Sequence, residues 1–460
     1  MIRFLTSGES HGEYLTAIIE GFPAGLKLNP DRINSMLHRR QQGYGASQRM
    51  KIELDEANIV SGIRFGETIG SPITIIIKNR EWSTWSEVMH PWGEPVGKRI
   101  VTAPRPGHAD LAGMIKYQRS DGRDVLERAS ARETAVRCAV GAICNELLIA
   151  LDINIISHVV SIGEVVARNF PADYFELRRL AEMSPVRAAD QEAGERMIKL
   201  IDLAKDRGET LGGIIEVLAI DCPVGLGSYV HWDRRLDARI AYAMMSIPAI
   251  KGVEIGLGFE STKQVGSKTL DAIRLRHPEI KFRHPEIKFR HPEIKFRHPE
   301  AEPRDLNARL LPPDGFAWGL KAFSARNDGP RHPERSEGSQ REIAEPVLNE
   351  VKDPPPRNDK FIRTTNHAGG IEGGMSNGEP VIVRCAMKPL PTLMKPLSTI
   401  DTKTGEIRNA AIERSDVCAV PRAAVVCEAV MAIVITDALM ELTGGDTFSA
   451  IQNRVKTKQH

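Results

Sequence analysis

The 460-residue sequence has little of several features that would assign it quickly to a class of protein. Aromatic residues make up 5% of it, which disfavours binding of single-stranded nucleic acid by base stacking. Its formal net charge is +2, so the chain as a whole gives no argument for binding nucleic acid or a membrane surface. No C-x-x-C pair occurs, and we expect reduced, buried thiols, as in a cytoplasmic protein, at Cys138, Cys144, Cys222, Cys385, Cys418 and Cys427.

Long apolar segments are also missing. The N-terminal residues carry no apolar stretch typical of a signal peptide. The most apolar late run, from Ala423 to Thr436, contains Glu428 and is too short to span a bilayer. No G-x-G-x-x-G motif lies between a predicted strand and a predicted helix, which argues against a Rossmann dinucleotide site. We therefore expect neither a membrane span nor a nucleic-acid partner, and no metal site.

The hydrophobic periodicity predicts both strands and helices. They do not alternate with a regular βαβ rhythm, which favours a layered α+β fold. We expect residues 79–85, with Trp82 and Trp85, to form a packed loop. Strands are predicted at 3–7, 15–20, 69–78, 153–160, 213–220, 252–257 and 380–387, and helices at 31–41, 130–150, 172–184, 189–206, 233–245 and 421–442.

One segment differs from the rest in composition. The heptapeptide RHPEIKF at 276–282 is repeated at 283–289 and 290–296, and begins again at Arg297. Each unit contains a proline, which breaks a helix, so the seven-residue period does not indicate a coiled coil. Proline and charge then continue to about Asp359. We predict a disordered insertion at 266–360 between two parts of a catalytic core, 1–265 and 361–445, with a C-terminal tail at 446–460.

Two neighbouring stretches carry the clearest chemical signal. His108 lies in a turn stiffened by proline and glycine, in APRPGHAD at 103–110. The segment RASARET at 128–134 follows, and its Ser130 and Glu133 fit a capping box at the start of a helix. Helix N-termini favour anions, and arginines surround this one. An ordinary capped helix with surface arginines would explain the capping signal alone, but the clustered basic groups favour an anion site.

Further candidate residues lie in separate segments. His11 is in a small-residue turn, and Arg40 and Arg49 flank a Gly-Tyr-Gly loop at 43–45. Residues 365–378 include five glycines, which allow a backbone to approach a flat or phosphorylated ligand closely. A proline-stiffened turn follows at 388–392, and Arg414-Ser-Asp416 precedes the last helix. Together these groups suit a ligand with several negative charges, and the histidines can move protons near neutral pH.

As a set, these motifs resemble chorismate synthase. The motifs are GESHG (8–12), RRQxGYG (39–45), RPGHAD (105–110), RASARET (128–134), GGIEGG (369–374), KPLPT (388–392) and RSDVC (414–418). The resemblance covers about residues 1–265 and 361–445. It implies a β-α-β sandwich, a homotetramer in the cytoplasm, and elimination of phosphate from 5-enolpyruvylshikimate 3-phosphate to give chorismate. It also implies bound reduced FMN without net redox change, with NADPH as one route to its reduction.

The resemblance also assigns roles to individual residues. His11 and His108 match the protonating groups, and Asp416 matches the acidic residue that assists proton removal through the flavin. Positions Arg40, Ala46, Arg49, Arg105 and Arg132 match the substrate and NADPH side. The FMN-contact positions are Arg128, Ala129, Ser130, Pro248, Ala249, Gly373, Lys388, Pro389, Leu390, Pro391, Thr392 and Arg414.

Three positions depart from the family pattern. Ala46 stands where an arginine is common, His367 replaces the second asparagine of a Thr-Asn-Asn segment, and Pro248 replaces an asparagine of some members. These departures and the insertion keep two other functions open. One is a flavin- or anion-binding protein without turnover, against which the retained histidines and Asp416 argue. The other is a flavin oxidoreductase that consumes NADPH.

Overall fold

The structure is a computed structural model that describes residues 2–46, 54–275 and 361–459. The heptapeptide repeats and Arg49 lie outside the described residues, and so does the prediction of disorder for 276–360. The described residues belong to one compact unit. They form helices and antiparallel sheets, which confirms the α+β class.

The first sheet has four antiparallel strands in the order β1-β2-β6-β3. Its strands are β1 (Arg3–Ser7), β2 (Tyr14–Glu20), β3 (Asn58–Ser61) and β6 (Ile73–Lys78). Alternate residues of β2 and β6, among them Leu15, Ile19, Ile75 and Ile77, are fully buried on one face. This period of two is typical of a sheet that covers the core with one side only.

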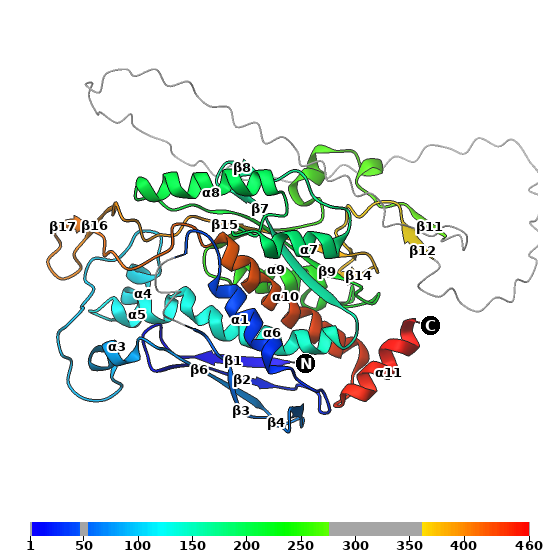
Figure 1. Cartoon of the computed structure of the whole chain (residues 1–460), viewed down its shortest axis with the longest axis horizontal. Coiled ribbons are helices and arrows are strands. Elements are labelled where there is room, and N and C mark those ends of the chain that lie inside the picture. Colours follow the sequence, from blue (N-terminus) through cyan, green and yellow to red (C-terminus); the bar gives the residue numbers. More distant parts are fainter. Residues whose placement is uncertain (1, 47–53, 276–360, 460) are drawn as a thin grey trace, which may run out of the picture. The chain divides into compact units, whose positions relative to one another are not determined.

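The second sheet has five antiparallel strands in the order β10-β15-β9-β7-β8. They are β7 (Asn154–Ile162), β8 (Val165–Val166), β9 (Gly213–Ile220), β10 (Ile250–Ile255) and β15 (Val381–Met387). The residues of β7 after Asn154 are all buried. Such a continuous buried run requires cover on both faces, and helices on opposite sides of β7 provide it (Figure 1).

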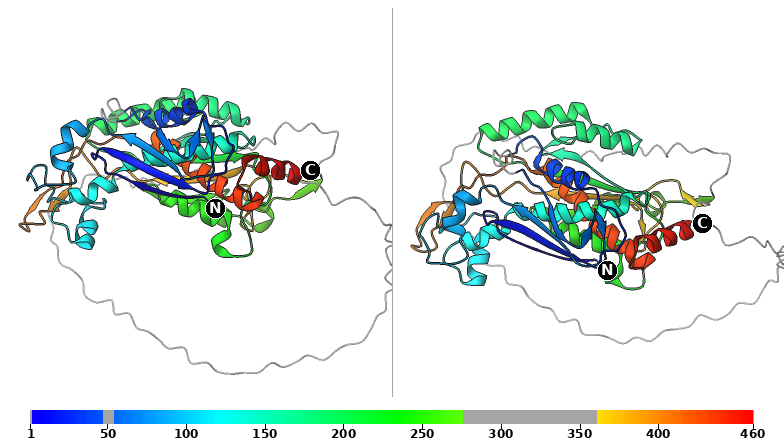
Figure 2. Two further views of the ribbon diagram at one scale, coloured as in Figure 1. Left: turned by 90° about the horizontal axis from the view of Figure 1, so that it is seen from below. Right: turned by 60° about the horizontal axis from the view of Figure 1, so that its bottom comes forward.

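Helices fill the space between the two sheets (Figures 1 and 2). The helix α6 (Thr134–Ile149) packs on β1, β2 and β6, and α10 (Val420–Thr443) packs on β7 and β9. The two helices pack directly on each other. A side chain at Gly141 would lie 2.5 Å from Ala429, so this glycine allows their close approach. By length and composition α10 could cross a membrane, but 94% of its apolar window is buried inside the protein, as in a core helix.

The other elements surround this core. The helices are α1 (Pro30–Gln41), α3 (Trp82–Met89), α4 (Asp110–Tyr117), α5 (Arg123–Ala129), α7 (Tyr174–Met183), α8 (Gln191–Asp206), α9 (Leu236–Met245) and α11 (Phe448–Gln459). The short strands are β4 (Ile63–Arg64), β5 (Glu67–Thr68), β11 (Ile273–Leu275), β12 (Phe361–Arg363), β13 (Ile371–Glu372), β14 (Met375–Ser376), β16 (Ser398–Ile400) and β17 (Ile407–Asn409). Short 3₁₀ turns are η1 (Ala131–Glu133), η2 (Trp232–Arg234), η3 (Gly258–Lys263) and η4 (Gly266–Lys268).

Several predicted elements need correction. Trp82 and Trp85 lie in helix α3 and not in a loop. Ser130 caps η1 and not α6, because its hydroxyl accepts from the backbone N–H of Arg132. Glu133 pairs with Arg137 four residues on, so the predicted capping box does not form. The short helices α4 and α5 were not predicted, and the predicted tail forms α11.

The predicted boundary of the insertion also shifts. Residues 266–275, assigned to the insertion from sequence, form η4 and β11, and β11 pairs antiparallel with β12. The carboxylate of Asp271 accepts hydrogen bonds from the Thr365 hydroxyl and from the backbone N–H groups of His367 and Ala368. The chain therefore leaves and re-enters the described unit at one place.

All six cysteines are buried and unpaired by disulfides, as predicted. Burial raises the pKa of Cys138, Cys144, Cys222 and Cys418 to about 12. Thiols with such a pKa are chemically inert at neutral pH, so these side chains act as small apolar residues of the core.

Candidate active site

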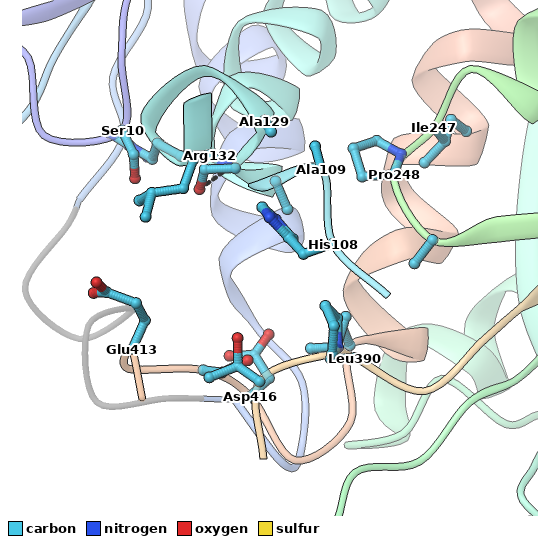
Figure 3. Close-up of a pocket in the computed structure, with 18 of the residues that line it drawn as sticks. Ser10, His108, Ala109, Ala129, Arg132, Ile247, Pro248, Leu390, Glu413 and Asp416 are labelled. Atoms are coloured by element: carbon cyan, nitrogen blue, oxygen red, sulfur yellow. Dashed lines mark hydrogen bonds between the residues drawn. The ribbon is translucent and has the colours of Figure 1, made fainter. Parts of the chain in front are cut away.

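A pocket of about 510 Å³ lies where the predicted motifs meet (Figure 3). Its volume falls within the range of about 300–1,000 Å³ that is usual for small-molecule sites. The predicted site residues that line it are His11, Arg40, Arg105, His108, Ala129, Ser130, Arg132, Pro248, Ala249, Lys388, Leu390, Pro391, Thr392, Arg414 and Asp416. Segments from both sides of the insertion therefore build one site.

Four predicted positions within the described residues do not line this pocket: Ala46, Arg128, Gly373 and Pro389. Arg49 lies outside the described residues. The guanidinium of Arg128 donates to the carbonyls of Thr6 and Gly8, so it ties α5 to β1 and the turn that follows it. Gly373 is an exposed residue of the β13–β14 turn, while Ala46 and Pro389 are not among the lining residues.

His108 is held by its own sequence neighbours. Its Nδ1 lies 2.5 Å from Oδ1 of Asp110, and Arg105 donates to the same carboxylate through Nε at 2.8 Å. Burial acts to raise the pKa of Asp110, but the hydrogen bonds from His108 and Arg105 hold it well below its usual range. Nδ1 also lies 3.0 Å from Nη2 of Arg105, which can only donate, whereas the ionised carboxylate can only accept. The contact with Asp110 is the shorter of the two, so we assign the Nδ1 proton to the bond with Asp110. This assignment leaves Nε2 as the other ring nitrogen for chemistry.

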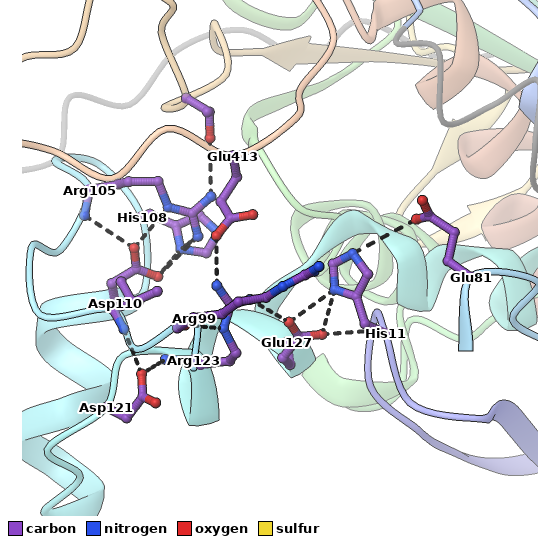
Figure 4. A network of polar contacts seen from close by, with 12 residues as sticks. His11, Glu81, Arg99, Arg105, His108, Asp110, Asp121, Arg123, Glu127 and Glu413 are labelled. Atoms are coloured by element: carbon purple, nitrogen blue, oxygen red, sulfur yellow. Dashed lines mark hydrogen bonds and ion pairs between the residues drawn. The ribbon is translucent and has the colours of Figure 1, made fainter. Parts of the chain in front are cut away.

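His11 is held by residues from distant parts of the sequence (Figure 4). Its Nδ1 lies 3.0 Å from both carboxylate oxygens of Glu127 in α5. Its ring stacks on Trp85 of α3, with centroids 3.8 Å apart and planes 20° apart. Its Nε2 lies 4.0 Å from a carboxylate oxygen of Glu81. Neither Glu127 nor Trp85 was predicted from the sequence as a site residue.

Two buried arginines form a cationic wall. Oδ1 of Asp55 accepts from Arg132 at 2.6 Å, and Oδ2 accepts from Arg40 at 3.3 Å. Arg40 also donates to the Thr134 hydroxyl and to the carbonyl of Ala131. Burial lowers the pKa of Arg40, but an arginine remains cationic at neutral pH. The wall is therefore positive and rigid before any ligand enters.

A third buried arginine was missed by the sequence analysis. Arg422, in the first turn of α10, lines the pocket beside Asp416 and forms an ion pair with it. Burial, and then the charge of Arg40, lower the pKa of Arg422 to about 9. Within the described part of the chain its Nε has no hydrogen-bond partner. A cation in the first turn of an apolar helix opposes the helix dipole, and this was the signal available in the sequence.

Another part of the pocket lining is largely apolar. Ile247, Pro248 and Ala249 connect α9 to β10, and Leu390 and Pro391 follow β15. Ala249 has φ of 70°, which is unusual for a residue with a Cβ, and its carbonyl accepts from the backbone of Lys388 at 2.9 Å. The Lys388 ammonium binds the carbonyl of Gly107, which joins this wall to the His108 turn. The pocket thus combines an apolar surface with cations and two histidines.

Among residues 2–46, 54–275 and 361–459, no group of three or more His, Cys, Asp or Glu side chains is placed to hold a metal ion. The ionisable groups of the pocket instead pair with one another. Arg414 donates to Glu81 at 2.6 Å, and Arg105 reaches the Thr392 hydroxyl at 3.1 Å. The arrangement can bind a multiply charged anion and supply protons from its histidines.

Comparison with known proteins agrees with this geometry. The chorismate synthase family model matches residues 2–288 and 341–440. Chorismate synthase of Syntrophotalea carbinolica is 46% identical over 99% of this chain and 97% of its own length, and that of Moorella thermoacetica is 45% identical over 99% and 97%. A crystal structure of a chorismate synthase matches with a TM-score of 0.65 and 35% identity, over 99% of this chain and 96% of that one. The chain therefore belongs to the chorismate synthase family.

Proposed function

We propose that this protein is a chorismate synthase, which removes phosphate from 5-enolpyruvylshikimate 3-phosphate by anti-1,4-elimination to give chorismate. The observation that carries this proposal is the meeting, in one pocket, of His11, His108 and Asp416 with a wall of buried arginines. A pure binding site for an anion would need the cations alone. The family to which the chain belongs supports the same reaction.

The arginines account for substrate binding. The substrate carries a phosphate and two carboxylates, and each can accept charge-assisted hydrogen bonds. Arg40 and Arg132 are fixed by Asp55, and Arg105 is fixed by Asp110 and Thr392, so little ordering is needed when the anion binds. Arg422 adds a further buried cation to the pocket lining. Such preorganised positive charge also stabilises phosphate as it leaves.

The histidines and Asp416 account for proton movement. His108 holds its Nδ1 proton toward Asp110, and its Nε2 would protonate the departing phosphate. His11 would be the second proton donor, serving the flavin when it is bound. Asp416 is buried and paired with Arg422, and it is the carboxylate that would assist removal of the ring proton. We thus assign protonation of the phosphate to His108 and protonation of the flavin to His11.

The pocket suits reduced FMN in part. The apolar surface of Pro248, Ala249 and Leu390 fits a flat ring, and Ser130, Lys388, Thr392 and Arg414 supply polar groups nearby. The Arg128 guanidinium binds backbone carbonyls, and neither Arg128 nor Gly373 lines the pocket, so we do not assign these two residues to the flavin. When bound, reduced FMN supplies an electron-rich ring beside the substrate and is regenerated without net oxidation.

The assembly and the cellular setting follow from the same family resemblance. We place the protein in the cytoplasm as a homotetramer. Exposed large apolar side chains around η2 and α9, such as Trp232 and Tyr242, provide surface for contacts between subunits. The core arrangement of two sheets around helices α6 and α10 agrees with the expected β-α-β sandwich. NADPH is one route to the reduced flavin, and a separate reductase is the other.

The experiment is anaerobic turnover by the full chain. Protein, 5-enolpyruvylshikimate 3-phosphate and chemically reduced FMN are mixed, and chorismate and phosphate are measured. Equal amounts of both products are expected, and His108→Ala and His11→Ala should each lower kcat by about 10²- to 10⁴-fold. Flavin binding without product would instead support a binding protein. A parallel reaction with oxidised FMN and NADPH tests self-reduction, and NADPH consumption without chorismate would indicate an oxidoreductase.

A further inference from the structure

Glu127 makes an unusual number of contacts with one short turn. Its carboxylate accepts from the backbone N–H of His11 at 2.9 Å and from the ring Nδ1 at 3.0 Å. Its own carbonyl accepts from the backbone N–H of Ser10 at 2.9 Å. Arg123, one turn earlier in α5, donates to the same carboxylate at 2.9 Å. The side chain is only 1% exposed, so water does not compete for these bonds.

The charge of Glu127 determines which His11 nitrogen holds a proton. Burial acts to raise the pKa of Glu127, but the hydrogen bonds and charges of His11 and Arg123 keep it below its usual value. The carboxylate is therefore ionised at neutral pH and can only accept. Nδ1 of His11 must then be a donor. The imidazole therefore gains or loses its proton at Nε2, on the side away from Glu127, while Nδ1 stays protonated.

The face of the His11 ring is fixed independently. Trp85 stacks on the ring, and Arg99 lies 3.8 Å from the centroid of the Trp85 ring. Stacking restrains tilt of the imidazole, while Glu127 restrains its rotation within the plane. Both restraints are needed to hold Nε2 of His11 in one position. Glu127 does not line the pocket, and it is linked to lining residues by two routes: directly to His11, and through Arg123 to Glu413. Only the contact with His11 bears on the position of the imidazole proton.

We propose that Glu127 is a positioning residue that fixes the tautomer of His11, so that Nε2 is the atom that donates or accepts the proton in the pocket. This role rests on the proposed function of the site. The alternative is that Glu127 only joins α5 to the turn at 8–12 as a structural ion pair. The two roles differ in one measurable respect, because only the first requires a defined proton position on His11.

The first test observes the tautomer directly and needs no turnover. The full chain is labelled with ¹³C,¹⁵N-histidine, and the His11 signal is assigned by its loss in His11→Gln. Spectra are taken without ligands at about pH 9, where a free imidazole is neutral. Wild-type His11 should be the Nδ1-protonated tautomer. Observation of the Nε2-protonated form in the wild-type protein overturns the proposal, whatever the variants do.

The variants then test the cause. In Glu127→Gln one oxygen is replaced by an amide that can also donate, so the His11 signal should become a mixture of tautomers. Glu127→Asp keeps the charge and should retain the Nδ1 proton, and it serves if the glutamine variant does not fold. The matched control is Glu216→Gln, because Glu216 forms a similar buried pair with His158 at 3.0 Å away from the pocket. An unchanged His11 tautomer in folded Glu127→Gln contradicts the proposal.

Turnover provides the second readout. General acid–base catalysis contributes about 10²–10⁴-fold, so loss of the correct tautomer should lower kcat by about 10- to 100-fold. KM for 5-enolpyruvylshikimate 3-phosphate and the affinity for FMN should change much less than kcat, since Glu127 does not line the pocket. A rise in KM with unchanged kcat overturns the proposal. Absence of turnover in the wild-type protein sinks the proposed function, while the tautomer experiment still decides the role of Glu127.

Discussion

His108 and His11 line the same pocket, but different parts of the chain fix their rings. His108 is held by Asp110, two residues away in the sequence, and Asp110 is in turn bound by Arg105. His11 is held by Glu127, at a separation of 116 residues, and by Trp85 of α3. The first arrangement forms within one turn, whereas the second exists only after α3, α5 and the turn at 8–12 have packed together. The His11 side of the pocket therefore depends more on tertiary structure.

Among substitutions of the residues that hold the two histidines, the one with the largest expected effect on kcat is Asp110→Asn, which removes the carboxylate that holds His108. The carboxylate is fully buried and accepts from His108 and from the backbone and guanidinium of Arg105. An asparagine offers one acceptor and turns a donor toward these groups, so both His108 and Arg105 lose their orientation. We expect kcat to fall by about 10²- to 10³-fold, more than in Glu127→Gln. The control is Asp124→Asn, whose exposed ion pair with Arg119 should contribute little.

A smaller effect should appear in the pH dependence of the free energy of unfolding, to which the carboxylates beside both histidines contribute. The pKa of Asp110 and of Glu127 is lower in the folded protein than its ordinary value. A lowered pKa gives stability that is present above the ordinary carboxyl pKa and is lost as the pH falls toward the folded value. The free energy of unfolding should therefore fall as the pH drops below about 5, toward the lowered pKa of each carboxyl group. The total fall should be on the order of 1–2 kcal/mol smaller in either amide variant.

Urea unfolding at several pH values measures this difference. The same pH dependence in the wild-type protein and in both variants would show that neither carboxylate contributes to it. If only Asp110→Asn reduces the dependence of the free energy of unfolding on pH, ionised Glu127 does not stabilise the fold. Asp124→Asn should follow the wild-type curve.

The smallest expected effect concerns Trp85, which stacks on His11, whereas no aromatic ring among the described residues stacks on His108. Stacking with aromatic rings contributes about 0.5–1.5 kcal/mol, so Trp85→Leu should lower kcat by about 2- to 10-fold. Trp85→Phe retains an aromatic face and should lose less. Trp92→Leu is the matched control, because Trp92 is 82% exposed and does not line the pocket. Equal losses at Trp85 and Trp92 would argue that stacking on His11 has no role.

The same contrast explains what the sequence could predict. The Arg105–His108–Asp110 cluster lies within one motif, and its residues meet in the structure as its local turn suggested. Lys388 to Thr392 also meets the pocket, because prolines limit the path of that segment. The main strands and long helices follow their apolar periods. These features depend on residues that are close in sequence.

Other residues depend on packing that no local pattern specifies. Glu127 was passed over although it lies among arginines, because its partner is on another element. Arg422 was missed because it lies in the first turn of a largely apolar helix. Arg128 was assigned to the flavin from its position in the motif, whereas its side chain extends along the other side of α5 to backbone carbonyls. Residue type indicates what a side chain can bind, and tertiary contacts decide what it meets.

The pairing of β11 with β12 has a consequence for how this family can vary. Leu275 and Phe361 are direct partners in the ladder, and Asp271 binds the backbone just beyond it. The folded unit itself therefore holds the two ends of the intervening sequence together. Because the entropy of closing a loop grows only with the logarithm of its length, segments of very different length can be accepted here at small cost. The connecting sequence can therefore be shortened, lengthened or replaced, by evolution or by protein engineering, while the residues of the pocket stay in place.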